Sequence, residues 1–182
     1  MSEYVKIEKA GGVLRLVLNR PEKKNALTDA MYKALADALE ASNADSETRV
    51  VLLRGEGDMF TAGNDIADFA AVNAGSGGGS GGPRNVHRFI RNISAATKPI
   101  VAAVQGRAVG VGTTMLLHCD QVILAEETKL SAPFVGLALV PEAASSLLLP
   151  ALIGHRRAFS VFALGEAVEA RLARVPAIGE GG

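Results

Sequence analysis

The sequence lacks several features that would assign it to common functional classes. It contains one cysteine, Cys119, so no disulfide can form within the chain, and this fits a reducing, cytoplasmic compartment. Lys plus Arg and Asp plus Glu both number 19, and a formal net charge of zero gives no electrostatic reason to expect nucleic acid or an anionic membrane as a partner. The three histidines do not follow a metal-ligand spacing, so no metal ion is expected.

Long apolar runs are also missing. The residues Met1–Lys6 do not contain the apolar core of a signal peptide. The most apolar stretch, Ile100–Ala125, is interrupted by Gln105, Arg107, His118 and Asp120, so it falls short of a membrane span. A chain of 182 residues is long enough for one well-filled core, and we therefore predict a single domain over residues 1–182 without a membrane segment.

Apolar strands that alternate with helices dominate the rest of the pattern. Predicted strands cover residues 4–8, 13–18, 49–54, 100–104 and 121–125, and helices are predicted from Thr28-Asp29 onward, over 86–96 and over 110–117. Gly11-Gly12 is typical of a hairpin turn, and a short helix is expected after Asp65. The run Gly75–Gly82 predicts a mobile surface loop. Strands that are continuously apolar predict an α/β fold whose strands are covered on both faces.

Two glycine-bearing segments, Phe60–Ile66 and Gly106–Thr114, each lie where a strand ends and a helix begins. Such a turn leaves backbone N–H groups unpaired at the start of the helix, where they can bind an anion. Two such turns that converge can hold one developing oxyanion between them. Taken singly, each turn is more often structural than functional.

The order and spacing of several motifs identify a resemblance to a known family. From about residue 5 to residue 166 the chain resembles the crotonase (enoyl-CoA hydratase/isomerase) family. The motifs are Leu18–Pro21, Lys24–Leu27, Phe60–Ile66, Lys98-Pro99, Ala102–Val104, Gly106–Thr114, Cys119-Asp120 and Gly154–Ala158. The resemblance implies a crotonase-like spiral of ββα units that binds an acyl-CoA thioester bent between two loops, with coenzyme A as part of the substrate rather than a cofactor.

The tail, residues 167–182, departs from the family pattern. Family members usually continue with C-terminal helices that complete the pocket and build trimers, and this helical part is expected to be truncated here. Apolar surface between Ala143 and Ala163 should then stay exposed unless another chain covers it. We therefore expect a homo-oligomer or an unstable monomer.

The resemblance also implies the binding residues. Two backbone N–H groups hold the thioester oxygen in the family, and by position these belong to Asn64 and Val111. Each preorganised donor is typically worth about 3 kcal/mol when charge develops on that oxygen. Because a β-branched residue is strained at positive φ, Val111 must have a negative φ. The coenzyme A side is implied to involve Lys24, Ala26, Ala62, Gly63, Asp65, Ile66 and Gly110. Lys24 has the alternative of a solvated loop residue, and Asp65 that of a helix cap.

The acids separate the possible reactions. Hydratases of this family resemble one another in carrying two glutamates around a water, and the corresponding positions here are Thr114 and Phe134, neither of which is an acid. Glu142, just after Pro141, resembles the single glutamate of the monofunctional Δ3,Δ2-enoyl-CoA isomerases. One acid suffices for a proton shuttle, and apolar surroundings would raise its pKa toward the useful range. The alternative is that Glu142 stabilises the first turn of the following helix.

The favoured function is therefore the isomerisation of 3-enoyl-CoA to 2-enoyl-CoA in fatty acid metabolism, with Glu142 as the proton shuttle. Hydration of 2-enoyl-CoA, a lyase activity, or other crotonase chemistry stays open as an alternative. An alternative of a different class is an inactive, truncated relic that folds and binds coenzyme A without turnover.

Overall fold

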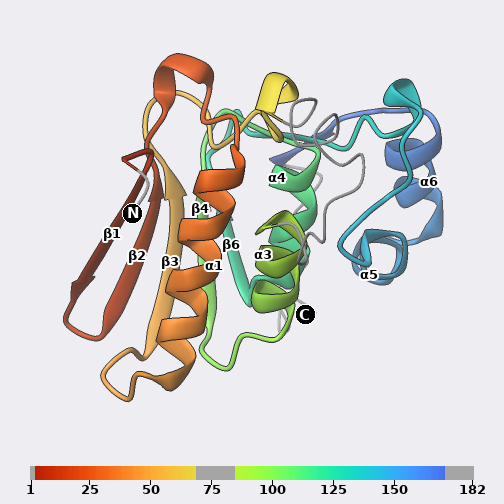
Figure 1. Ribbon diagram of the computed structural model, residues 1–182. Helices are drawn as coiled ribbons and strands as arrows, with labels where there is room; N and C mark the ends of the chain where they lie inside the picture. Colours follow the sequence, from red (N-terminus) through yellow and green to blue (C-terminus); the bar gives the residue numbers. More distant parts are fainter. Residues whose placement is uncertain (1–2, 69–84, 171–182) are drawn as a thin grey trace, which may run out of the picture.

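The computed structural model describes residues 3–68 and 85–170, and most strands in these ranges form one five-stranded sheet (Figure 1). Its order is β1-β2-β3-β4-β6. The strands are β1 (Val5–Ala10), β2 (Val13–Leu18), β3 (Val50–Gly55), β4 (Ile100–Val104) and β6 (Gln121–Leu124). β1 and β2 pair antiparallel, and the other neighbouring strands pair in parallel. This mixed sheet with helices confirms the predicted α/β fold.

The hairpin between β1 and β2 turns at the two predicted glycines. Gly11 and Gly12 have φ values of 59° and 81°. A two-residue turn with positive φ at both positions matches the right-handed twist of the flanking strands, and glycine adopts it without strain from a Cβ atom. The sequence therefore fixes the register in which Val5 faces Leu18.

Helices α1 (Asp29–Ala44) and α3 (Asn85–Ser94) lie side by side over one face of the sheet (Figure 1). The Thr28 side chain caps α1 by accepting a hydrogen bond from the Met31 N–H at 3.3 Å, as its position before the apolar repeat predicts. Tyr32 of α1 and Phe89 of α3 pack with ring centroids 5.6 Å apart. Both rings belong to the main hydrophobic core.

The two faces of the sheet are not equally covered. Burial alternates along β3 and β4, and the second face of these strands is only half-buried. On the edge strand β6, Ile123 is 57% exposed. The prediction that the strands are covered on both faces holds at the end of β2, where Leu16, Val17 and Leu18 are all buried. It is wrong for β3, β4 and β6, because α1 and α3 pack on the same side.

A second, three-stranded sheet begins within the glycine-bearing segment Gly106–Thr114. It consists of β5 (Arg107–Val109), β7 (Lys129–Ser131) and β8 (Val168–Glu169), in the order β5-β7-β8. The helix predicted over residues 110–117 is shorter than expected. It is an α-helix only over α4 (Val111–Thr114) and then tightens into the 3₁₀ helix η2 (Met115–His118). Two further 3₁₀ turns are η1 (Pro21–Lys23) and η3 (Val135–Leu137).

Helices α5 (Ser145–Ile153) and α6 (His155–Ala163) pack on each other and lie to one side of the main layers (Figure 1). They enclose a small separate core of buried residues that comprises Ala132, Phe134, Leu149, Ala158 and Val161. Their outer surfaces are apolar, since Leu147 is 73%, Leu152 54% and Phe159 53% exposed. The predicted exposure of apolar surface in this part of the chain is confirmed.

Two predictions lie outside the described residues, namely the loop Gly75–Gly82 and the end of the tail beyond Ala170. Within the described ranges, no helix is both long enough and apolar enough to cross a membrane.

Candidate functional site

The loop that follows β2 runs beside the first glycine turn. The Ala62 N–H donates to the Lys24 carbonyl at 2.9 Å, and the Leu27 N–H donates to the Gly63 carbonyl at 2.8 Å. The Asp65 N–H in turn donates to the Leu27 carbonyl at 2.9 Å. The structure thus brings together the residues that the resemblance assigns to coenzyme A binding on these two segments.

This pairing sets the direction of the Asn64 N–H. The C=O and N–H of a trans peptide point in opposite directions. Because the Gly63 carbonyl points at Leu27, the Asn64 N–H of the same peptide points away from Leu27. No acceptor for this N–H is found among the described residues.

The second glycine turn lies on the side toward which that N–H points. Thr61 and Ala108 form a parallel bridge, in which the Val109 N–H donates to the Thr61 carbonyl at 3.1 Å. The turns approach so closely that a Cβ on Gly63 would lie 2.7 Å from the Val109 carbonyl oxygen. Gly63 also has a φ of 87°, so the close approach and the backbone conformation both require glycine.

Val111 begins α4 directly after this bridge. Gly110 adopts a φ of 57°, and its carbonyl accepts hydrogen bonds from Thr113 at 2.9 Å and Thr114 at 3.0 Å. The Gly110 carbonyl therefore points into the helix, and the Val111 N–H of the same peptide points out of its start. Val111 is absent from the non-glycine residues with positive φ, as its predicted role requires.

Asn64 and Val111 occupy equivalent places in the two turns. Thr61 and Ala108 are the two bridged residues. Asn64 follows Thr61 by three residues, and Val111 follows Ala108 by three residues. In the part of the chain that the structure describes, no acceptor is found for the Val111 N–H either. Two free N–H groups on adjacent turns form an arrangement that can stabilise negative charge on one oxygen.

Glu142 reaches this region from the loop before α5. The Thr114 hydroxyl donates a hydrogen bond to Glu142 Oε1, and Thr114 itself is buried on α4. Burial raises the pKa of the Glu142 carboxyl above its ordinary value. The Thr114 hydrogen bond and the charges of His118 and His87 lower it in part.

The alternative that Glu142 stabilises the first turn of α5 is not supported by the structure. Helix α5 begins at Ser145, its N-cap is Ala144, and no side chain caps it. Glu142 precedes the helix and directs its carboxylate to Thr114. Thr114 and Phe134, which the sequence resemblance places where hydratases carry glutamates, are both buried, and Phe134 packs on Phe162.

The backbone after Glu142 is strained. Ala143 and Ala144 both have a φ of 53°, a conformation that costs a residue with a Cβ atom about 1–2 kcal/mol. His118 Nε2 lies 2.9 Å from the Ala143 carbonyl oxygen. A carbonyl can only accept, so this ring nitrogen must carry a hydrogen and donate it. Ser145 Oγ is fully buried and has no hydrogen-bond partner among the described residues.

Tyr32 joins the site, although the sequence analysis assigned it no role. Its hydroxyl donates to Asn64 Oδ1. Burial raises the pKa of Tyr32 well above its ordinary value, and the negative charges of Glu142 and Asp68 raise it further. The phenol therefore contacts the Asn64 side chain, and its charge state is coupled to that of Glu142.

The two charged residues predicted to bind coenzyme A already have partners. Lys24 is exposed, and its Nζ lies 3.0 Å from Asp58 Oδ2. Asp65 Oδ1 accepts the N–H groups of Ala67 and Asp68, each at 3.1 Å, as a helix cap does. Its other oxygen lies 2.7 Å from Arg20 Nη1, and this bond lowers the pKa of Asp65.

Arg20 belongs to the motif Leu18–Pro21, but the sequence analysis assigned no role to its side chain. The Arg20 side chain also donates to the Ala26 carbonyl at 3.1 Å. It thereby connects the loop after β2 to the start of the helical residues at Ile66. Ile66 itself is 80% exposed beside these turns.

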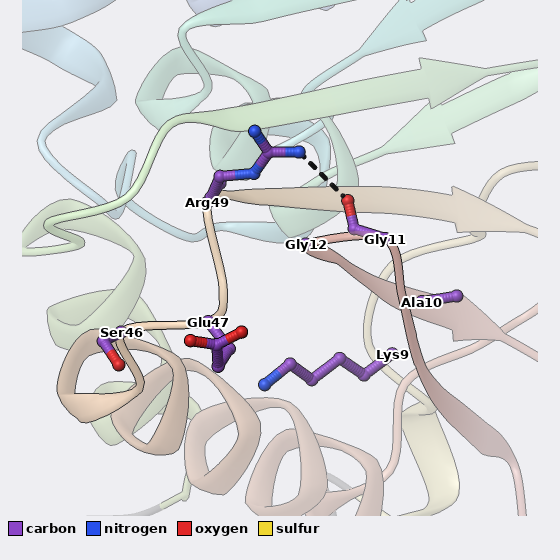
Figure 2. Close-up of a pocket in the computed structure, with 7 residues that line it drawn as sticks. All are labelled: Lys9, Ala10, Gly11, Gly12, Ser46, Glu47 and Arg49. Atoms are coloured by element: carbon purple, nitrogen blue, oxygen red, sulfur yellow. Dashed lines mark hydrogen bonds between the residues drawn. The ribbon is translucent and has the colours of Figure 1, made fainter.

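A hollow elsewhere on the molecule is separate from these turns (Figure 2). It is lined by Lys9, Ala10, Gly11, Gly12, Ser46, Glu47 and Arg49. It lies before β2 and β3, at the amino ends of the parallel strands, whereas ligands of open α/β sheets bind beyond the carboxyl ends. Its cations also have partners: Arg49 donates to the Gly11 carbonyl at 3.2 Å, and Lys9 pairs with Asp45.

Comparison with known proteins identifies the family of the chain. Residues 8–175 match the model of the enoyl-CoA hydratase/isomerase family. The chain belongs to this family of enzymes. The resemblance that the sequence motifs indicated is therefore confirmed.

Two curated relatives are isomerases of CoA thioesters by name. The 1,2-epoxyphenylacetyl-CoA isomerase of Escherichia coli (strain K12) is 35% identical over 177 residues, which cover 95% of this chain and 67% of that protein. Enoyl-CoA delta isomerase 2 of Rattus norvegicus is 32% identical over 171 residues, which cover 93% of this chain and 44% of that protein. The chain thus spans about half to two thirds of the length of these relatives.

A solved structure shows the same fold. The enoyl-CoA hydratase/isomerase from Pseudoalteromonas atlantica T6c superposes with a TM-score of 0.87 at 47% sequence identity. The match covers 94% of this chain and 66% of that one. The crotonase-like α/β fold predicted from the sequence is confirmed by this similarity.

Proposed function

We propose that this chain catalyses the isomerisation of a 3-enoyl-CoA to a 2-enoyl-CoA, with Glu142 as the single acid–base group. The observation that carries the proposal is the Glu142 carboxyl. It is half-buried, has a raised pKa, and bonds to α4 one helical turn after the free Val111 N–H. A carboxyl whose pKa lies above its ordinary value is suited to accept and return a proton near neutral pH.

In the proposed reaction, the thioester oxygen accepts hydrogen bonds from the N–H groups of Asn64 and Val111. Glu142 takes a proton from the α-carbon, and the electrons of that C–H bond move onto the thioester as an enolate. The two N–H groups stabilise this charge, at about 3 kcal/mol for each donor. The thioester carbonyl then re-forms, the electrons of the enolate C=C bond form the 2,3 double bond, and the electrons of the original 3,4 double bond take the proton that Glu142 returns to the γ-carbon. Atoms and charge balance, and no water is consumed.

We further propose that the CoA moiety lies along the paired segments after β2 and β3. These segments carry Lys24, Ala26, Ala62, Gly63, Asp65 and Ile66, and Gly110 lies on the adjacent turn. Exposed Ile66 and Lys24 are accessible to such a ligand. The Asp65 carboxylate instead pairs with Arg20 and contributes by holding the turn in its conformation.

The test is to offer purified protein a 3-enoyl-CoA and a 2-enoyl-CoA separately and to identify each product. We expect 2-enoyl-CoA from the first substrate and no hydration of the second. Glu142→Gln keeps the size and the acceptor for Thr114 but removes basicity. Its turnover should fall by about 100- to 10,000-fold, while CoA binding measured by calorimetry stays close to that of the parent.

Three results would contradict this proposal. A Glu142→Gln variant as active as the parent would exclude the proton shuttle. A 3-hydroxyacyl-CoA product would favour hydratase chemistry. Binding of CoA without turnover of any tested thioester would favour the inactive relic. Because one relative is a 1,2-epoxyphenylacetyl-CoA isomerase, that thioester belongs among the substrates tested.

We also propose that the chain acts in the cytoplasm and associates with copies of itself. The single Cys119, whose burial raises the thiol pKa to about 12, is suited to a reducing compartment. The exposed leucines of α5 are the surface that association would cover.

A further inference from the structure

The Thr114 hydroxyl is the side-chain hydrogen-bond donor to Glu142 among the described residues. Thr114 is 1% exposed, so water does not compete for this hydroxyl. Its backbone N–H donates to the Gly110 carbonyl at 3.0 Å, which fixes Thr114 in α4. A β-branched side chain in a helix has few rotamers, so the position of the hydroxyl follows from the helix.

Thr114 follows Val111 by three residues. Residues three apart lie on the same face of a helix. One short helix therefore offers the free Val111 N–H at its start and, one turn later, a hydroxyl that binds the Glu142 carboxylate. The distance between the base and this N–H is thus set by α4 rather than by the loop that carries Glu142.

We propose that Thr114 is a positioning residue. Its hydroxyl binds Glu142 Oε1, leaves Oε2 for the proton transfer, and holds the carboxylate at a fixed position relative to the Val111 N–H. This inference rests on the proposed function. The hydroxyl has one hydrogen to give. The Val111 carbonyl, at 3.4 Å, is the weaker of its two acceptors, and the carboxylate is the stronger because it is charged.

The same hydrogen bond acts on protonation. A hydrogen bond donated to a carboxylate stabilises its charged form and opposes the effect of burial. Three other titratable groups act on Glu142 from neighbouring elements, namely His118 on η2, His87 on α3 and Tyr32 on α1. These groups stay in place when only Thr114 is changed, so a change in the pH dependence can be assigned to the hydroxyl.

The experiment compares Thr114→Val, which removes the hydroxyl at constant shape, with Thr114→Ser, which keeps it. The measurement is the pH dependence of kcat and of kcat/KM for 3-enoyl-CoA isomerisation. For Thr114→Val we expect kcat to fall by about tenfold and the midpoint of the rise of kcat/KM to move to higher pH. Thr114→Ser should retain the parental midpoint. A Thr114→Val variant with the parental kcat and midpoint would overturn the inference.

A second readout does not depend on turnover. The Glu142 carboxyl can be titrated by NMR in the full chain, using carboxyl-labelled glutamate and Glu142→Gln to assign its signal. Its midpoint should rise in Thr114→Val or, if that variant does not fold, in Thr114→Ala, and stay unchanged in Thr114→Ser. An unchanged midpoint without the hydroxyl would contradict the inference.

Failure of the inference and failure of the proposed function give different results. If Glu142→Gln is inactive and Thr114→Val resembles the parent, only the positioning role is wrong. If Glu142→Gln is as active as the parent, the proposed function is wrong. In that case a titration shift caused by Thr114 would still show the hydrogen bond but not a role in catalysis, and the inference would fall with the function.

Discussion

The proposed oxyanion donors and the proposed base lie in two regions that are built differently. Asn64 and Val111 follow turns that are joined by a parallel bridge and packed so tightly that Gly63 has no room for a Cβ atom. Glu142 lies on a loop that leads into α5, among exposed apolar side chains and two strained alanines. The donors are therefore fixed by backbone geometry, whereas the base depends on side-chain contacts to the first region.

This difference predicts how each region responds to substitution. A change inside the packed turns should disrupt the donor geometry as a whole, because backbone groups cannot adjust one at a time. A change in the Glu142 region should have graded effects on association, pH dependence and stability.

The largest effect is expected for Gly63→Ala. A Cβ atom here would lie 2.7 Å from the Val109 carbonyl oxygen, so the two turns must separate. Loss of one aligned oxyanion donor typically lowers kcat by about 100- to 1,000-fold. Steady-state isomerase kinetics measure this loss. The matched control is Gly11→Ala. Gly11 also has a positive φ, of 59°, but a Cβ atom there would meet no neighbouring atom, so this variant should keep the parental kcat. Equal losses in both variants would show that φ strain, rather than turn separation, causes the effect.

Association should depend on the outer surface of α5. Replacing exposed Leu147 and Leu152 together by Asn removes two large apolar groups from this surface. We expect the parent to form concentration-dependent oligomers in light scattering, and the double variant to dissociate at concentrations at which the parent is associated. Ile7→Asn, an exposed position on β1, serves as the control and should behave like the parent. A monodisperse parental monomer would contradict this prediction.

The raised pKa of Glu142 also predicts a pH dependence of stability. Burial makes the folded state hold its proton more tightly than the unfolded state. The folded state therefore binds more protons in the window between the ordinary pKa of 4.5 and the raised value, and the contribution of Glu142 to stability falls as the pH rises through it. Urea unfolding of the parent should show this fall, and Glu142→Gln should lack it. Parallel curves for the two proteins would contradict the expectation.

The smallest effect is expected at the strained alanines. Ala143→Gly relieves a positive φ, and the free energy of unfolding should rise by up to about 1 kcal/mol. The same substitution at Ala41, an exposed position in α1, should lower stability by about 1 kcal/mol. Denaturant melts of both variants provide the comparison. Destabilisation by Ala143→Gly would show that this backbone conformation is not strained.

The sequence predicted local features of the fold better than the contacts that build the candidate site. The turn at Gly11-Gly12 and the Thr28 cap were predicted from neighbouring residues, and each depends on chemistry within a few positions. The contacts between Tyr32 and Asn64 and between Thr114 and Glu142 join residues 32 and 28 positions apart. Nothing in the spacing of a core tyrosine or a helical threonine indicates its distant partner.

The errors of prediction have physical reasons as well. The apolar runs of β3 and β4 predict cover on both faces, but periodicity does not indicate on which side the helices pack. The helix predicted over 110–117 is α-helical in its first half and 3₁₀ in its second, since apolar residues are compatible with both kinds of turn. The choice of Glu142 over Thr114 and Phe134 depended on family resemblance, and its role is still a prediction.

The most direct test of the central claim is hydrogen exchange at the α-carbon. A saturated acyl-CoA can form the enolate but has no double bond to move, so exchange in D₂O reports only proton removal and oxyanion stabilisation. The account predicts that NMR and mass spectrometry detect deuterium at the α-carbon with the parent protein, and about 100-fold or more slower exchange with Glu142→Gln. Equal exchange by both proteins, or bound acyl-CoA without exchange in the parent, would contradict the account.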